Sequence, residues 1–322
     1  MKRRLLYINI GFYQYESHII NAFEKSGYEV ITFCDKPKTN FFSLLLYRLF
    51  PKSKTDFLAN EKAQMLFLKS LPENFKFDKI VVIVGRHLSF NFLNELKKKH
   101  CNGDCVLYLW DDVRRVKNFS SNFKIYDRIY SFDKIDCQTF GLTFLPLFYI
   151  NDFLYNQETK NYDICCIGAD HSNRFFIVSS IVKQATPLCS NNFIFLHSGF
   201  LTTFKRKLRF GSKNSSFISK EYFSLESTVN ILKRSKYVID VQYASQRGLT
   251  LRTFEALASK CKIITTNRDI CNYDFYNLNN VAIIDRKNPK IDKDFFDSPY
   301  IDIDEAIVKK YSIDVWVSIL LN

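Results

Sequence analysis

The residues best suited to chemistry lie between Asp240 and Asn267, in the run DVQYASQRGLTLRTFEALASKCKIITTN. A strand is expected to end at Asp240, and a helix is expected to begin near Thr250. The first turn of a helix carries free backbone N–H groups and the positive end of the helix dipole, so it suits an anion such as a diphosphate. Arg247 and Arg252 flank this helix start, where guanidinium groups can clamp phosphate oxygens.

Glu255 follows Arg252 by three residues, which places both side chains on one face of the expected helix. A carboxylate at that position can accept hydrogen bonds from both hydroxyls of a ribose. The same residues also fit an amphipathic helix whose charges are simply solvated. Residue types and spacing alone leave these two interpretations equally open.

A second candidate segment is Tyr162–Arg174, YDICCIGADHSNR. Gly168 ends the expected strand and permits a tight turn with close approach of a ligand. His171 and Arg174 then open a helix, again at an end that favours anions. His197 follows the next expected strand. His171 equally fits a helix start without a ligand, and His197 equally fits a satisfied surface histidine.

Carboxylates that could act as a general base follow the expected strand Val106–Trp110. Transfer to a hydroxyl needs a carboxylate or imidazole that takes the proton as the new bond forms, and Asp111 and Asp112 are the first candidates. One of them equally fits a cap for the following helix. Rival candidates follow two other expected strands: Glu16, His18, Arg86 and His87.

The elements that must position these residues alternate between strand and helix along the whole chain. Apolar runs that predict strands are Leu5–Ile10, Tyr28–Phe33, Lys79–Val84, Val106–Trp110, Arg128–Phe132, Phe144–Pro146, Tyr162–Ile167, Phe193–Leu196, Tyr237–Asp240, Lys262–Thr265 and Val281–Ile284. Helical spacing predicts Ser17–Ser26, Phe90–Lys99, Arg174–Gln184, a helix ending at Val229–Ser235, Thr250–Ser259 and a C-terminal helix over Ile303–Leu321. Such alternation is typical of parallel α/β sheets.

A polar stretch from Asn151 to Asn161 predicts a linker between two such domains. The expected division is 1–155 and 156–322, and the last helix is able to pack back on the N-terminal domain. The predicted fold class is therefore α/β, with two Rossmann-like domains facing a cleft. Ligands of open parallel sheets bind outside the carboxyl ends of the strands, which is where the candidate residues lie.

The formal net charge of +13 favours an anionic partner: nucleic acid, an anionic membrane surface or a phosphorylated substrate. No nucleic-acid-binding motif is recognisable. The nine cysteines form no disulfide frame, and no second Cys/His pair follows Cys101 and Cys105, so we expect no metal site. No signal peptide and no membrane-spanning run of about 18 apolar residues is evident, which predicts a cytoplasmic protein.

The Asp240–Asn267 segment resembles the donor-site helix of GT-B glycosyltransferases. It particularly resembles bacterial lipopolysaccharide and capsule biosynthesis transferases related to the spore-maturation-protein type. The motif residues are Gly248-Leu249, Arg252, Glu255-Ala256-Leu257 and Thr266-Asn267, and the likeness extends through Asp274-Phe275-Tyr276 and Ile284-Asp285-Arg286. Tyr108–Asp112, Ser131–Asp133 and Phe144–Phe148 have looser counterparts in the same group.

The resemblance implies a metal-independent glycosyltransferase with no cofactor other than its nucleotide-sugar substrate. It would move a hexosyl or related sugar to a lipid-linked glycan acceptor in lipopolysaccharide O-antigen or capsule biosynthesis. The implied donor-binding residues are Gly168, His171, Arg174, His197, Gln246, Arg247, Gly248, Leu249, Thr250, Arg252 and Glu255. The alternatives are a non-catalytic GT-B-like assembly protein and, less favoured, a basic nucleic-acid-binding protein.

Two basic-apolar segments predict contact with the anionic inner face of the cytoplasmic membrane. Asn40–Lys54 is apolar between lysines, and Phe200–Lys220 interleaves lysine and arginine with phenylalanine and leucine. A core helix and a solvated loop, respectively, are the plain alternatives.

Overall fold

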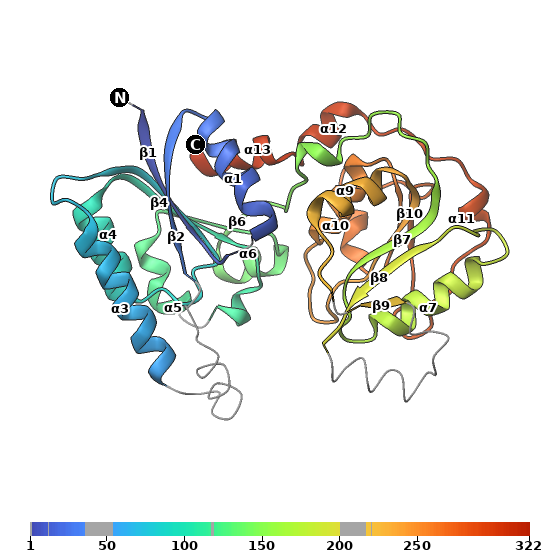
Figure 1. Ribbon diagram of the computed structural model, residues 1–322, viewed down its shortest axis with the longest axis horizontal. Coiled ribbons are helices and arrows are strands. Elements are labelled where there is room, and N and C mark those ends of the chain that lie inside the picture. The colour runs from blue at the N-terminus through green and yellow to red at the C-terminus, as the bar shows by residue number, and fades with distance from the viewer. Residues whose placement is uncertain (1, 12, 36–53, 117–118, 200–216, 220) are drawn as a thin grey trace. The chain divides into compact units, whose positions relative to one another are not determined.

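The computed structural model describes residues 2–11, 13–35, 54–116, 119–199, 217–219 and 221–322. The chain forms two compact domains (Figure 1): the first comprises Met1–Pro146 together with Trp316–Asn322, and the second comprises Leu147–Val315. Nearly all of both segments expected to contact a membrane lies outside the described residues. Among the helices that the structure describes, none is long and apolar enough to cross a bilayer.

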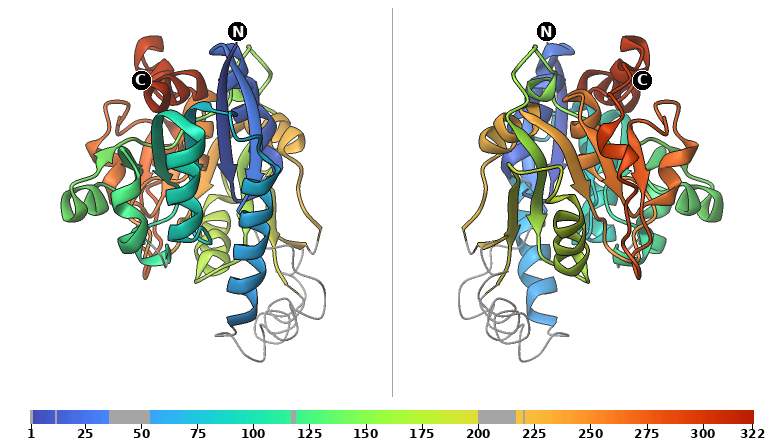
Figure 2. Two further views of the ribbon diagram at one scale, coloured as in Figure 1. Left: turned by 90° about the vertical axis from the view of Figure 1, so that its left-hand side faces the viewer. Right: turned by 90° about the vertical axis from the view of Figure 1, so that its right-hand side faces the viewer.

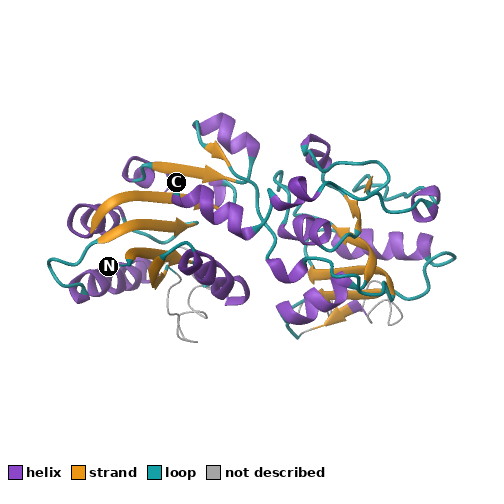
Figure 3. Ribbon diagram, turned by 90° about the horizontal axis from the view of Figure 1, so that it is seen from above, coloured by secondary structure: helices purple, strands orange, loops and turns teal. Residues whose placement is uncertain are grey.

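The first domain is built on a six-stranded parallel sheet with the order β2-β1-β3-β4-β5-β6. Its strands are β1 (Arg3–Asn9), β2 (Tyr28–Cys34), β3 (Phe77–Ile83), β4 (Cys101–Leu109), β5 (Arg128–Ser131) and β6 (Thr143–Phe144). Its helices include α1 (Tyr13–Lys25), α3 (Lys54–Ser70), α4 (Phe90–His100), α5 (Phe119–Asn122) and α6 (Lys134–Phe140). Helices lie on either side of the sheet (Figure 3), which explains why the strands are nearly continuous apolar runs.

The second domain repeats this plan of sheet and flanking helices (Figure 2). Its sheet has six parallel strands in the order β12-β11-β10-β7-β8-β9. Its strands are β7 (Tyr162–Ala169), β8 (Phe193–His197), β9 (Ile218–Ser219), β10 (Ser235–Asp240), β11 (Lys262–Thr265) and β12 (Val281–Ile283). Its helices include α7 (Arg174–Ala185), α9 (Leu225–Lys233), α10 (Leu251–Ala258), α11 (Asp294–Asp297) and α12 (Glu305–Lys309). Every strand predicted from the sequence is present, and the prediction of two Rossmann-like domains is confirmed.

The predicted single helix over Ile303–Leu321 is wrong. The chain instead forms α12 and a separate helix α13 (Ile313–Leu321). Between them, Tyr149 N–H donates to the carbonyl of Tyr311 at 2.9 Å, and Ile313 N–H donates to the carbonyl of Tyr149 at 2.9 Å. These bonds hold backbone groups in a parallel bridge, so the helix is interrupted there.

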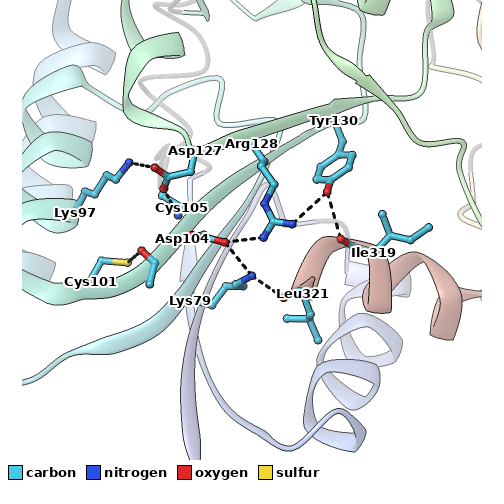
Figure 4. Close-up of polar contacts among 11 residues, drawn as sticks. Lys79, Lys97, Cys101, Asp104, Cys105, Asp127, Arg128, Tyr130, Ile319 and Leu321 are labelled. Carbon is cyan, nitrogen blue, oxygen red and sulfur yellow. Dashed lines mark hydrogen bonds and ion pairs between the residues drawn. The ribbon is translucent and has the colours of Figure 1, made fainter.

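Helix α13 packs on the first sheet (Figure 1). The buried Trp316 ring meets Tyr108 of β4 edge-on, with ring centroids 4.9 Å apart. At the helix end, Lys79 Nζ donates to the carbonyl of Leu321 at 2.6 Å and Tyr130 donates to the carbonyl of Ile319 at 3.3 Å (Figure 4). A cation at a helix C-terminus opposes the negative end of the helix dipole, so Lys79 fixes the last turn of α13 both by charge and by hydrogen bonding.

We expect Lys79→Met to destabilise the first domain by about 1.5–3 kcal/mol, because a charged hydrogen bond to a helix end is lost. The free energy of unfolding, measured by urea denaturation, tests this. Lys98→Met is the control, because Lys98 is exposed on α4 of the same domain. Equal stability of the two variants would contradict a role for Lys79 in holding α13.

Candidate functional site

The order of the second sheet puts its change of direction at the neighbouring strands β7 and β10, and open parallel sheets carry a crevice beyond the strand ends at such a point. The chain passes from β7 to β8 and β9 on one side, then returns to β10 and continues to β11 and β12 on the other side. In open parallel sheets, ligands bind at this change of direction, outside the carboxyl ends of the strands. The relevant strand ends are Ala169 of β7 and Asp240 of β10.

Arg174 spans this crevice from the first residue of α7. Its Nη1 donates to the carbonyl of Ala169 at 2.7 Å, and its Nε donates to the carbonyl of Val241 at 2.9 Å. Nη2 also donates to Val241. The guanidinium therefore ties together the two strand ends and brings a positive charge to the crevice.

Gly168 has a different role from the expected tight turn. It lies inside β7 and is not among the glycines with positive φ. A Cβ at this position would lie 2.5 Å from Arg174 Nη1. The missing side chain therefore makes room for the Arg174 guanidinium.

Helix α10 begins beside this crevice without a side-chain cap. Thr250 is the N-cap residue, but its hydroxyl donates to Asp240 Oδ2 at 2.7 Å instead of accepting from the helix. Thr253 donates to the same oxygen at 2.7 Å. The buried Asp240 carboxylate is thus held by two hydroxyls, and the first-turn N–H groups of α10 are not occupied by a capping side chain.

Arg252 and Glu255 form the pair that their spacing predicted, but the pair is buried. Glu255 is 1% exposed, and its Oε2 lies 2.6 Å from Arg252 Nη1. Arg252 Nη2 also lies 3.4 Å from the carbonyl of Ile167. The expected contact of Glu255 with a ribose stays a prediction, and all residues from Thr253 to Ala258 are buried.

Arg286 is a further cation in this region. It belongs to the Ile284-Asp285-Arg286 segment of the sequence resemblance, from which no role was predicted for it. It follows β12, and it donates to Asn173 Oδ1 at 2.7 Å, to the carbonyl of Gln242 at 2.6 Å and to Thr266 Oγ1 at 3.1 Å. Burial, followed by the positive charge of Arg174, lowers the pKa of Arg286. An anion bound beside Arg286 would relieve this repulsion.

The loop before α10 is fixed mainly through its backbone. Asn267 Nδ2 lies within hydrogen-bonding distance of the carbonyls of Arg247 and Gly248, at 2.9 and 3.2 Å. Gln246 Nε2 also donates to Gly248, at 3.1 Å. Leu249 is buried, while the side chain of Arg247 is exposed. Of the predicted loop residues, Arg247 is therefore the one that presents a charge to solvent.

Both candidate histidines stack on tyrosine rings. His171 and Tyr243 lie face to face, with centroids 3.5 Å apart and an interplanar angle of 11°. His197 stacks on Tyr222 at 4.3 Å, and its Nδ1 lies 3.0 Å from the carbonyl of Glu221. Flat aromatic pairs at strand ends are suitable surfaces for a planar ring such as a nucleobase.

The first domain places its candidate residues at the carboxyl ends of β1 and β4. Asp111 is partly exposed and forms an ion pair with Arg86 at 2.5 Å. Asp112 is buried and pairs with Arg114 at 3.1 Å, so it suits a structural role better than that of a base. Glu16 accepts from Asn9 Nδ2 at 2.7 Å.

His18 lies half-buried on α1, one residue after the expected helix start at Ser17. The structure begins this helix earlier, at Tyr13, so Glu16 belongs to its first turn. Among the described residues, no group of three or more histidine, cysteine, aspartate or glutamate side chains could hold a metal ion.

No protein-family model and no curated protein matches the chain. Solved structures do match. The catalytic domain of starch synthase IV from Arabidopsis thaliana, bound to ADP and acarbose, aligns with a TM-score of 0.58 at 9% identity, over 98% of this chain and 95% of that chain. An α-glucosyltransferase in complex with UDP and a DNA 13-mer aligns with a TM-score of 0.54 at 12% identity, over 99% of this chain and 90% of that chain.

A putative UDP-N-acetylglucosamine 2-epimerase from Listeria monocytogenes aligns with a TM-score of 0.54 at 11% identity, over 100% of this chain and 95% of that chain. The chain also spans 60% of a matched chain in a GtfA/B complex, at a TM-score of 0.48 and 10% identity. At these identities the likeness shows the fold, which is the GT-B arrangement of two Rossmann-like domains.

Gly168→Ala should disturb the crevice, because the new methyl group would collide with Arg174 Nη1. The guanidinium tip would have to shift and weaken its hydrogen bond to the carbonyl of Ala169, so we expect the free energy of unfolding to fall by about 0.5–1.5 kcal/mol. Gly199→Ala is the matched control, since a Cβ at Gly199 would meet no atom of the described residues within 4 Å. If Gly168→Ala were as stable as the control, Arg174 would not be held as described.

Proposed function

We propose that this protein is a glycosyltransferase that moves a sugar from a nucleotide-sugar donor to an acceptor hydroxyl. The observation that carries the proposal is the charge of the crevice between β7 and β10. Arg174, Arg252 and Arg286 gather there beside an uncapped helix start, against the buried carboxylates of Asp240 and Glu255. This leaves a net positive site of the kind that binds a diphosphate.

The donor would bind with its diphosphate at the first turn of α10. Arg286 and Arg252 would offset the charge that develops on the leaving diphosphate, which is how such sites accelerate transfer without a metal. The stacked pair His171–Tyr243 would carry the base. Because Glu255 is buried against Arg252, we assign it the positioning of Arg252, and direct contact with a ribose would require Arg252 to move.

In the transfer step, an acceptor hydroxyl oxygen would attack the anomeric carbon of the sugar. The bond from that carbon to the diphosphate oxygen would break, and its electron pair would leave with the nucleotide. The hydroxyl proton would pass to a carboxylate, for which Asp111 is our first choice, since it is more exposed than Asp112.

We further propose a lipid-linked glycan as acceptor, in the synthesis of bacterial lipopolysaccharide O-antigen or capsule by a transferase related to the spore-maturation-protein type. The support is the sequence resemblance and the net charge of +13, which suits a protein held at the anionic inner face of the cytoplasmic membrane. The alternative is a GT-B-like assembly protein that binds nucleotide sugar but does not transfer it.

The first test is a thermal-shift screen against UDP, GDP, ADP, CMP and dTDP and their sugars. We expect at least one nucleotide sugar to raise the melting temperature, because a ligand that binds only the folded state stabilises it. Failure of every nucleotide would refute the donor site. If a nucleotide sugar raises the melting temperature but no free nucleotide is released when lipid-linked acceptors are added, the assembly-protein alternative would be favoured.

Arg286→Gln tests the anion site directly. Loss of a charged hydrogen bond of about 1.5–3 kcal/mol should weaken nucleotide diphosphate binding by about 10- to 150-fold in isothermal titration calorimetry. Arg234→Gln is the control, because Arg234 is exposed at the start of β10, the end opposite the crevice. An unchanged dissociation constant in Arg286→Gln would place the diphosphate elsewhere.

A further inference from the structure

The turn that follows β3 in the first domain is strained. Val84 has a φ of +66°, and Gly85 N–H donates to the carbonyl of Ile83 at 2.8 Å, which makes a three-residue γ-turn centred on Val84. A branched side chain rarely adopts positive φ, and such a residue costs about 1–3 kcal/mol. Strain of this kind persists only where neighbouring contacts enforce it, and it is concentrated at functional sites.

Asp35 is one of the contacts that enforce the turn. It follows β2 directly and is 3% exposed. Its Oδ2 accepts the backbone N–H of His87 at 3.0 Å, while its own N–H donates to the carbonyl of Asn9 at 2.6 Å. On the other side of the turn, Gln64 Nε2 donates to the carbonyl of His87 at 2.9 Å. The backbone at His87 is thereby held from both sides.

Two polar atoms beside the turn are buried without a partner among the described residues: Asp35 Oδ1 and Arg86 Nε. Leaving a buried polar atom unpaired costs about 1–3 kcal/mol, so folded proteins keep few of them. The strained turn and both unpaired atoms lie within one short loop and its contact residue. Strain and unpaired buried atoms that occur together in this way are typical of functional sites.

Arg86 connects the turn to the expected base. Its Nη2 lies 2.5 Å from Asp111 Oδ2, and the two side chains are 36% and 29% exposed. Asp35 is therefore linked to Asp111 through two contacts. The Asp35 carboxylate holds the turn backbone at His87, and Arg86 of the same turn pairs with the Asp111 carboxylate.

We propose that Asp35 is a positioning residue for sugar transfer, which holds the turn at residues 84–87 and, through Arg86, sets how firmly Asp111 is held. The proposal rests on the proposed function, because it takes Asp111 as the base. It assigns to Asp35 no contact with the substrate.

The ionisation of Asp35 makes the interaction between Arg86 and Asp111 depend on pH. Burial raises the pKa of Asp35 to about 7, although the His87 N–H and the Arg86 charge and N–H each lower it in part. Among the described residues, Tyr126 also interacts with Asp35: burial raises the pKa of Tyr126, with the charges of Cys105 and then Asp35 as smaller causes. Asp111 lies beyond Arg86.

The direction of this pH dependence follows because Asp35 and Asp111 both attract the guanidinium of Arg86. Below about pH 7, Asp35 is protonated and Asp111 is the main anionic neighbour of Arg86. Above that pH, ionised Asp35 also attracts Arg86, so the hold on Asp111 weakens and the carboxylate is freer to accept a proton. Transfer should therefore accelerate as the pH rises through about 7.

The test that needs no substrate follows the Arg86 Nε–Hε signal by nitrogen-15 NMR from pH 5 to 9, with Arg86→Lys used to assign it. In the wild-type protein the signal should shift with a midpoint near pH 7, and in Asp35→Asn that transition should disappear. Asp35→Glu, which keeps an ionisable carboxylate, should restore a transition at a changed midpoint. A transition that persists unchanged in Asp35→Asn would come from a histidine and would overturn the proposal.

Asp127→Asn is the matched control. Asp127 also accepts a backbone N–H, from Cys105 at 2.8 Å, and pairs with Lys97 at 2.7 Å (Figure 4), but it lies at the amino end of β5, whereas Asp35 follows the carboxyl end of β2. This variant should keep the Arg86 transition and the wild-type kinetics. Loss of the transition there as well would reveal a general effect of removing a carboxylate from the sheet.

A kinetic test uses UDP-glucose and whichever other nucleotide sugar protects the protein in the thermal-shift screen. In Asp35→Asn, kcat should fall by about 10- to 100-fold, and the rise near pH 7 should be lost, with KM for the nucleotide sugar unchanged. An unchanged kcat and pH profile would refute the positioning role. If no nucleotide protects the wild-type protein, the proposed function fails, while the NMR result still reports on Asp35 and Arg86.

Discussion

The second domain depends on how the backbone carbonyls at the ends of β7 and β10 are satisfied. The pairing of these two strands ends at Val238 and Cys165, so the carbonyls of Ala169 and Val241 lie beyond the last bond between β7 and β10. One guanidinium, that of Arg174, donates to both. The two carbonyls accept hydrogen bonds from a cation but carry no negative charge to neutralise it. The fold therefore leaves a positive charge in the crevice.

Other features of the crevice follow from this contact. A side chain at Gly168 would require the Arg174 guanidinium to shift, because Arg174 lies against this position. The charge of Arg174 also contributes to lowering the pKa of Arg286. The carboxylates nearby are already engaged, Asp240 by two threonine hydroxyls and Glu255 by Arg252. An anionic ligand is the species that would complete this balance.

The first domain offers the opposite chemistry at the corresponding edge of its sheet. Asp35, Asp111 and Asp112 gather there with Arg86 and Arg114. A carboxylate-rich edge suits the removal of a proton, whereas the cation-rich edge of the second domain suits a departing diphosphate. The two domains share one plan of strands and helices, and they differ in the charged side chains at the strand ends.

The sequence by itself determined the alternation of strands and helices, because strands covered on both faces must be continuous apolar runs and glycine marks where helices stop. It also determined that Arg252 and Glu255 would meet, since three-residue spacing is a local property of a helix. Three matters were decided only by tertiary structure. The burial of Glu255 depends on what packs over α10, and the break before α13 depends on a bridge to Tyr149, more than 150 residues earlier in the sequence. The environment of Asp35 depends on a turn about 50 residues away, which no spacing rule could connect to it.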